Sequence, residues 1–149
     1  MTEVPEGIAL LVRERRWAAL ATLDDGAPLA SMVAYAPEPG LAGLFLHLSE
    51  LSLHTRNLLA DPRASLVITD PDGGEGDPQL LPRVSLTGGV VLLDPDSAEW
   101  RAAREIYVAR FPDALPRFDL GDFRLFFFVP DEARYVGGFA KARRYRWGT

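Results

Sequence analysis

The residues best suited to chemistry lie in one short segment, Ser49 to Leu58, of this 149-residue chain. His54 and Arg56 follow Ser52, a residue type that begins helices because its side-chain oxygen accepts a hydrogen bond from an unpaired backbone N–H group. A helix N-terminus favours negative charge through its unpaired N–H groups and its dipole. Arginine adds a forked donor that fits phosphate. The segment therefore predicts a pocket for an anionic group, or else a capped helix with an exposed arginine.

Each side chain of this region also has a purely structural interpretation. His54 either contacts the anion or bonds a backbone carbonyl at the helix start. Arg56 either binds the phosphate or forms a surface ion pair. His47, on the preceding strand, is expected to be a packing or interface histidine rather than a haem ligand. Asn57 is expected to hydrogen-bond locally and fix the loop.

The composition excludes several classes of function. Without cysteine, and with only two histidines, the chain is not expected to hold a metal ion. The net charge of -5 disfavours nucleic acid as a partner, because binding to its phosphates needs a basic surface. The run of Lys141, Arg143, Arg144 and Arg146 is interpreted as a solvated tail or strand edge. Nucleophile elbow, phosphate-binding glycine loop and HExxH motifs are missing, so no residue is assigned a catalytic role.

The length of the chain fits one domain, residues 1–149, with a core of its own. No apolar run approaches the roughly 20 residues that a membrane span requires. The N-terminus lacks the basic region and apolar core of a signal peptide. We therefore expect a cytoplasmic protein without a membrane partner.

The spacing of apolar residues predicts the elements that position the segment. Helices are expected over Pro5 to Arg16 and from Asp94 to Phe111, where apolar residues recur at three- and four-residue steps. A short helix begins near Ser49 or Ser52 and ends before Asp61, which precedes a proline. The expected strands are Trp17–Leu23, Pro28–Tyr35, Leu41–Leu48, Ala64–Thr69, Arg83–Leu93 and Phe123–Val129, with a further short one at Arg134–Val136.

The connections between these strands indicate the fold class. Asp24-Asp25-Gly26 predicts a hairpin, because glycine supplies the positive φ of a tight turn. Ala64–Thr69 is almost wholly apolar and is expected to be buried on both faces. Short turns favour an antiparallel sheet, and closure into a small barrel removes exposed edges. The sequence predicts a mainly β (α+β) fold of about six strands with two or three peripheral helices.

Several blocks of sequence occur in a fixed order over about residues 15–142. The blocks are Ala30-Ser31-Met32-Val33, Leu46-His47-Leu48-Ser49-Glu50-Leu51, His54-Thr55-Arg56-Asn57-Leu58, Asp61-Pro62-Arg63, Val84-Ser85-Leu86-Thr87-Gly88, Tyr107 to Pro112, Asp122-Phe123-Arg124-Leu125 and Val136-Gly137-Gly138-Phe139-Ala140-Lys141-Ala142. In their joint order and spacing they resemble the pyridoxamine 5'-phosphate oxidase-like FMN-binding split-barrel family, in the branch related to bacterial haem-utilisation proteins.

This resemblance implies a six-stranded antiparallel split β-barrel that forms a homodimer, with FMN bound in two sites at the subunit interface. The strand with Ser31, Met32 and Val33 would run beside the flavin ring. Arg83 would lie where the family often places a glutamine that reaches toward the flavin from the other subunit. The residues expected at the ribityl phosphate are His47, Leu48, Ser49, Ser52, Leu53 and His54, with Arg56 and Asn57 beside them.

The chain departs from the family pattern where the family is basic. Family oxidases usually carry arginine at the position of Ser31 and lysine at that of Ala36, and Leu53 and His54 replace an arginine–lysine pair. Arg56, backbone N–H groups and a protonated His54 would have to compensate. Pyridoxamine phosphate oxidase activity is not expected, because the substrate residues of that enzyme have no match here. A haem ligand from the additional C-terminal domain of many haem-utilisation relatives would have no counterpart either.

Three functions follow from these features. The first is an FMN-dependent oxidoreductase acting on an unknown small molecule, in which the flavin exchanges hydride and the protein supplies position and electrostatics. The second is a dimeric module that binds haem or another planar anionic ligand without turnover. The third is a dimer whose cofactor site has decayed.

Overall fold

The computed structural model describes residues 4–137 and 142–148. Within these ranges, eight strands form one antiparallel sheet in the order β2-β1-β5-β6-β7-β4-β3, and β8 pairs with β7 outside this path. The strands are β1 (Trp17–Asp24), β2 (Ala27–Ala34), β3 (Ala36–Pro37), β4 (Leu44–Ser49), β5 (Arg63–Thr69), β6 (Arg83–Leu92), β7 (Phe123–Val136) and β8 (Ala142–Arg146).

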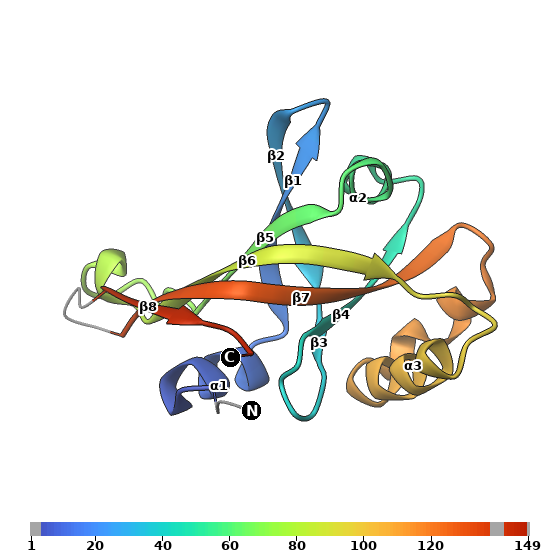
Figure 1. Ribbon diagram of the computed structural model, residues 1–149. Helices are drawn as coiled ribbons and strands as arrows, with labels where there is room; N and C mark the ends of the chain where they lie inside the picture. Colours follow the sequence, from blue (N-terminus) through green and yellow to red (C-terminus); the bar gives the residue numbers. More distant parts are fainter. Residues whose placement is uncertain (1–3, 138–141, 149) are drawn as a thin grey trace.

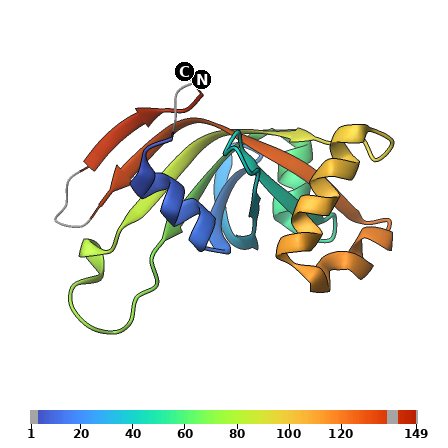
Figure 2. The same cartoon turned by 90° about the horizontal axis from the view of Figure 1, so that it is seen from below.

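Three α-helices and two 3-10 segments accompany the sheet in the described ranges. They are α1 (Glu6–Glu14), α2 (Leu53–Ala60), α3 (Ala98–Arg110), η1 (Pro78–Leu80) and η2 (Pro112–Asp119). In Figure 1 the β1–β2 hairpin crosses the long strands β5, β6 and β7, with α2 beside it. In Figure 2 both α1 and α3 lie below the long strands; α1 packs against the interior of the strongly curved sheet, and α3 packs against the opposite side of β4. None of these described helices has the length and apolar character to cross a bilayer.

This architecture confirms the expected antiparallel split β-barrel with peripheral helices. Six strands match the predicted ones, and β3 and β8 are additional. β3 is two residues long, too short to leave a pattern in the sequence. β8 pairs with β7 through part of the basic run that was interpreted as a tail or strand edge. The short strand expected at residues 134–136 is the end of β7 rather than a separate element.

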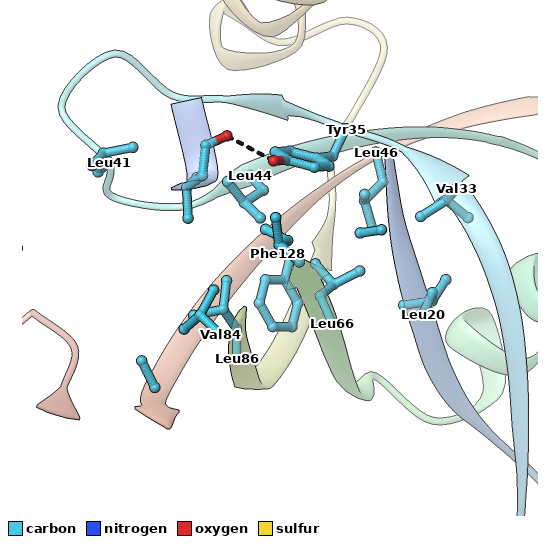
Figure 3. Packing of buried hydrophobic residues seen from close by; sticks show 14 of the residues in the cluster. Leu20, Val33, Tyr35, Leu41, Leu44, Leu46, Leu66, Val84, Leu86 and Phe128 are labelled. Carbon is cyan, nitrogen blue, oxygen red and sulfur yellow. Dashed lines mark hydrogen bonds between the residues drawn. The ribbon is translucent and has the colours of Figure 1, made fainter. Parts of the chain in front are cut away.

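The main core fills the space enclosed by the sheet. Leu20, Leu46, Leu66, Leu86 and Phe128 are fully buried and come from β1, β4, β5, β6 and β7 respectively. Figure 3 shows these side chains projecting into the same interior space. Successive strand residues point to opposite faces, so the sequence neighbours of these five residues face away from this core.

Tyr35 ties α1 to the barrel. Its side chain is fully buried, and its hydroxyl donates a hydrogen bond of 2.7 Å to the carbonyl of Val12, drawn as a dashed line in Figure 3. Burial raises the pKa of Tyr35, so the hydroxyl keeps its proton. The guanidinium of Arg110 lies 5.5 Å from the centre of the Tyr35 ring and donates to the carbonyls of Arg13 and Arg15. The last residue of α3 therefore caps the C-terminal end of α1.

The burial of the two faces of β4 and β5 differs from the expectation. β4 is buried on both faces, because α3 and η2 cover Phe45 and His47 on the side opposite the main core. For β5 the prediction of burial on both faces is wrong: Leu66 points inward, whereas Val67 is 38% exposed. No helix of the described chain covers the outward side of β5, and the apolar character of Val67 instead contributes to an exposed surface.

Gly88 is required at a close approach between β6 and β7. The pairing register shifts between Thr87 and Gly88, so a β-bulge lies there. A Cβ atom at position 88 would come within 2.1 Å of the carbonyl oxygen of Val129. Only glycine fits without displacing the backbone of β7.

Candidate functional site

The outward side of β1, β2, β5 and β6 is largely uncharged between Arg63 at one end of β5 and Arg83 at the start of β6. Met32, Ala19, Val67 and Ser85 lie side by side across these four strands in one row of the sheet. Met32 is 46% exposed, and Trp17, two residues from Ala19 on the same side, is 58% exposed. We call this surface, with Thr69 and Arg83 at its end, the outer face.

A groove of about 420 Å³ runs over part of the outer face. Its floor is apolar, and Arg15 and Arg16 lie at its rim. An exposed apolar groove of this kind is typical of a surface that binds a ligand or another protein. The lining residues are Glu14, Arg15, Arg16, Trp17, Ala19, Met32, Val67, Thr69 and Pro71.

The residues expected beside a flavin ring point in two directions. Met32 lies on the outer face, whereas Val33 is buried in the core. Ser31 also points inward, and its hydroxyl is buried without a hydrogen-bond partner. Arg83 shares the outer face with Met32, but its guanidinium donates to the carbonyls of Gln79 and Leu81 and so holds the loop that precedes β6. The structure places Met32 and Arg83 on one surface without bringing their side chains together.

The turn from β4 into α2 is fixed by its own side chains. The hydroxyl of Ser49 donates to Asp122 at 2.6 Å and accepts from the backbone N–H of Leu51 at 3.1 Å. Glu50 forms an ion pair with Arg124 at 3.2 Å. Ser49 therefore holds this turn against the start of β7 rather than presenting a free hydroxyl.

The first turn of α2 has unpaired donors and exposed apolar groups. Ser52 occupies the N-cap position, but its side chain makes no capping hydrogen bond. The backbone N–H groups of Leu53 and His54 have no partner among the described residues. Leu51 is 80% exposed and Leu53 is 39% exposed. Arg56 is exposed as well, and its guanidinium reaches only a backbone carbonyl at 3.5 Å.

His54 lies half-buried in this turn. In the part of the chain that the structure describes, its ring makes no hydrogen bond, ion pair or ring contact. Burial lowers the pKa of His54 below its usual value of 6.5, so the ring is neutral at neutral pH. A protonated His54 therefore does not replace the lost basic residues, and Arg56 is the charged side chain of this turn.

Three other predicted residues lie inside the protein. Leu48 points into the main core. His47 stacks on Phe118, with ring centres 3.7 Å apart, and its Nδ1 has no hydrogen-bond partner. Asn57 does not bond locally as expected: its amide donates across to the hydroxyl of Thr22 in β1 at 3.1 Å. This buried hydrogen bond anchors α2 on the β1–β2 hairpin.

Trp17 and Val67 were missed as candidates for the exposed surface. A signal existed in β1, where Trp17 alternates with the small residues Ala19 and Ala21 on the side opposite Leu20. A side of a strand made of small and aromatic residues without charge is unusual for a solvated surface. Which side stays open depends on where the helices pack, and periodicity alone does not show that.

The curved antiparallel sheet encloses one apolar core, carries peripheral helices and leaves the outer face uncovered, and this arrangement defines a split-barrel protein. The profile of the CREG β-barrel family matches residues 4–145, and the chain belongs to that family. This confirms the resemblance found in the sequence.

The relatives include two haem oxygenases. The chain is 38% identical over 120 residues to the chloroplast haem oxygenase HOZ of Arabidopsis thaliana, covering 79% of this chain and 34% of HOZ. It is 33% identical over 135 residues to the haem oxygenase HutZ of Vibrio cholerae, covering 87% of this chain and 74% of HutZ. Among solved structures, a haem-binding protein from Mycobacterium smegmatis matches with a TM-score of 0.81 and 30% identity, over 97% of this chain and 60% of that one. The chain thus spans about a third of HOZ and 60% of the mycobacterial protein.

Proposed function

We propose that this chain is a haem-binding module of the split-barrel class. The observation that carries the proposal is the first turn of α2, where a neutral His54 lies among exposed Leu51 and Leu53 with one cation, Arg56. Haem presents a broad apolar ring and two carboxylates, and a leucine-rich turn with one arginine matches that chemistry.

The relatives support the same ligand. HOZ and HutZ are haem oxygenases, and the mycobacterial structure is that of a haem-binding protein. Because the chain spans only part of HOZ and of the mycobacterial protein, the proposal concerns binding and not their whole activity. Binding without turnover is the function that we assign to residues 1–149 as one domain.

We further propose that the outer face is covered by a second copy of this chain. Trp17, Met32 and Val67 are exposed there on three adjacent strands, and charged groups lie only at the margins of the groove. Stable complexes bury about 800 Å² per partner, and a contact through the outer face would have to bury a similar area. A two-fold contact places the uncharged middle of the outer face against itself and leaves Arg83 at the margin of the contact.

FMN, in a flavin-dependent oxidoreductase, is the second candidate. The unpaired backbone N–H groups of Leu53 and His54 favour it, because such groups bind phosphate oxygens at helix N-termini. The buried hydroxyls of Ser31 and Thr55 also have no partner and could donate to a polar ligand. In that case the flavin supplies the redox chemistry and this chain supplies its position.

Titration of the purified protein with hemin and with FMN, in separate cells, tests the proposal. We expect a Soret band that saturates at one hemin per chain or per dimer, and weak or no quenching of flavin fluorescence. Tight FMN binding without a specific hemin complex would replace the proposal by the second candidate. A protein that binds neither ligand would contradict both.

Light scattering after gel filtration tests the dimer. We expect a dimer for the natural chain and a monomer for Met32→Glu, which puts a charge beside the groove of the outer face. Leu120→Glu is the matched control, because Leu120 is 51% exposed but lies before β7, outside the outer face. A monomeric natural chain, or equal effects of both substitutions, would refute the assignment of the interface.

A further inference from the structure

The strand β8 forms an open edge of the sheet. Among the described residues it pairs only with β7, and in Figure 2 it is the outermost strand beside β7. Four of its five residues are exposed, and Tyr145 is half-buried against the main core. An exposed strand edge is a template for a further strand, because its backbone N–H and C=O groups lack partners.

The ladder between β7 and β8 shows which backbone groups point to this edge. In an antiparallel pair, residues that exchange hydrogen bonds alternate with residues that do not. The N–H of Trp147 donates to the carbonyl of Asp131 at 2.9 Å, and the register continues through β8 without a shift. The backbone groups of Ala142 and Arg144 therefore point away from β7. Within the described chain, no residue bonds to them.

This edge carries a local excess of positive charge on an acidic protein, whose net charge is -5. Three of the five residues of β8 are arginine and none is acidic. Arg144 lies opposite Arg134 of β7, on the outward side of the sheet, and Arg146 lies opposite Glu132 on the same side. Glu132 forms ion pairs with both Arg134 and Arg144. One carboxylate is thus shared among three guanidinium groups on this side.

The charge of β8 decides which kind of strand fits its edge. Two β8 edges paired with each other would bring arginines together, and like charges directly opposite each other destabilise a sheet. An acidic strand replaces this repulsion by attraction. Because strand side chains alternate between faces, carboxylates at every second residue would all lie on the side of Arg144 and Arg146. A nucleic acid offers negative charge but no peptide backbone to pair with the edge.

We propose that β8 binds an extended acidic peptide segment of a partner protein, which adds to the sheet as a further strand. The backbone groups of Ala142 and Arg144 supply the main-chain hydrogen bonds. The guanidinium of Arg144, with those of Arg134 and Arg146 beside it, attracts carboxylates at alternate positions of the peptide. This interaction needs neither haem nor the contact through the outer face.

Binding of a designed peptide to the full chain tests the proposal. The probe is a fluorescently labelled, acetylated peptide of alternating glutamate and threonine, followed by fluorescence anisotropy. We expect saturable binding that weakens as the salt concentration rises, because the ion pairs are exposed to solvent. A peptide of the same composition with its glutamates in one block should bind several-fold more weakly. A copy of the alternating peptide with N-methylated amides should not bind, because it cannot complete the strand pairing.

Two variants separate the backbone from the charge. Ala142→Pro removes one outward N–H and leaves every charge and the hydrogen bonds to β7 in place, so affinity should fall about 2- to 10-fold. Arg144→Glu should lower affinity at least about fivefold. Arg101→Glu makes the same change of charge at an exposed position of α3 and is the matched control, with unchanged affinity. Circular dichroism checks that all three variants are folded.

Amide hydrogen exchange, followed by nuclear magnetic resonance, distinguishes strand addition from charge attraction alone. The amide of Arg144 should exchange rapidly in the free chain and become protected by the peptide, whereas that of Arg143 should be protected in both states. Binding without this protection would overturn the proposal, as would equal binding of the blocked peptide, heparin or duplex DNA. Absence of binding would overturn it too and would leave the arginines the role of preventing edge-to-edge pairing.

Discussion

When the pH is lowered, the His47→Phe variant should lose less free energy of unfolding than the natural chain does. His47 is stacked on Phe118, and burial together with the nearby charge of Arg117 lowers its pKa to about 4. The ordinary pKa of histidine, near 6.5, applies in the unfolded chain. Between these two values the unfolded chain binds a proton that the folded chain excludes. The contribution of His47 is therefore fully present above about pH 6.5 and is lost as the pH falls toward 4.

The magnitude follows from the two pKa values. Each pH unit within this window costs about 1.4 kcal/mol, so the loss is about 2 kcal/mol at pH 5 and approaches about 3 kcal/mol below pH 4. The ring is 8% exposed, so solvent screening reduces this figure little. A loss of 2 kcal/mol is a large share of the stability of a small domain, which is commonly 5–15 kcal/mol.

Urea unfolding followed by circular dichroism, at about pH 7.5 and about pH 5, measures this effect. Acidic residues and His54 contribute to the pH dependence of both proteins, so the quantity to compare is the loss between the two pH values. We expect that loss to be about 2 kcal/mol larger in the natural chain than in His47→Phe. Phenylalanine cannot titrate but keeps a ring against Phe118, and its own packing effect cancels in the comparison. Equal losses in both proteins would refute the buried, neutral state of His47.

Two further substitutions test contacts that position the site. Asn57→Leu should destabilise the fold by about 1–3 kcal/mol by leaving the buried hydroxyl of Thr22 unpaired, while Asn57→Leu with Thr22→Val should recover part of that loss. A double-mutant cycle by urea unfolding measures the coupling, and strictly additive effects would show that the hydrogen bond contributes nothing. Gly88→Ala should cost at least about 2 kcal/mol, because its Cβ would meet the carbonyl oxygen of Val129 at 2.1 Å. A thermal midpoint equal to that of the natural chain would contradict this contact.

Much of the barrel could be predicted from alternation along single strands. Leu44, Leu46 and Leu48 share one side of β4, and that side faces the main core as the period of two requires. The other side of β4 was not predictable in the same way. Phe45 and His47 are buried only because α3 and η2 fold back over them, and such a long-range contact leaves no periodic pattern within the strand.

The candidate site was predictable in position but not in its chemistry. The resemblance placed His54 and Arg56 at the start of a helix after β4, where the structure has them. The charge of His54 depends on its burial, which is set by how α2 packs on the β1–β2 hairpin. The partner of Asn57 lies 35 residues away in the sequence, so a local hydrogen bond was the wrong expectation.

The two proposed contacts lie on different sides of the same strand. Ala19 of β1 points outward under the groove, whereas Thr22, three residues further along, points inward and holds Asn57 of α2. Strand alternation therefore puts the surface proposed for the second copy and the helix proposed for haem on opposite faces of β1. A charge at Met32 perturbs the outer face without touching α2, and removal of the His54 ring leaves the outer face intact. Dimer formation and ligand binding thus rest on separate physical features of the fold, and either can fail without the other.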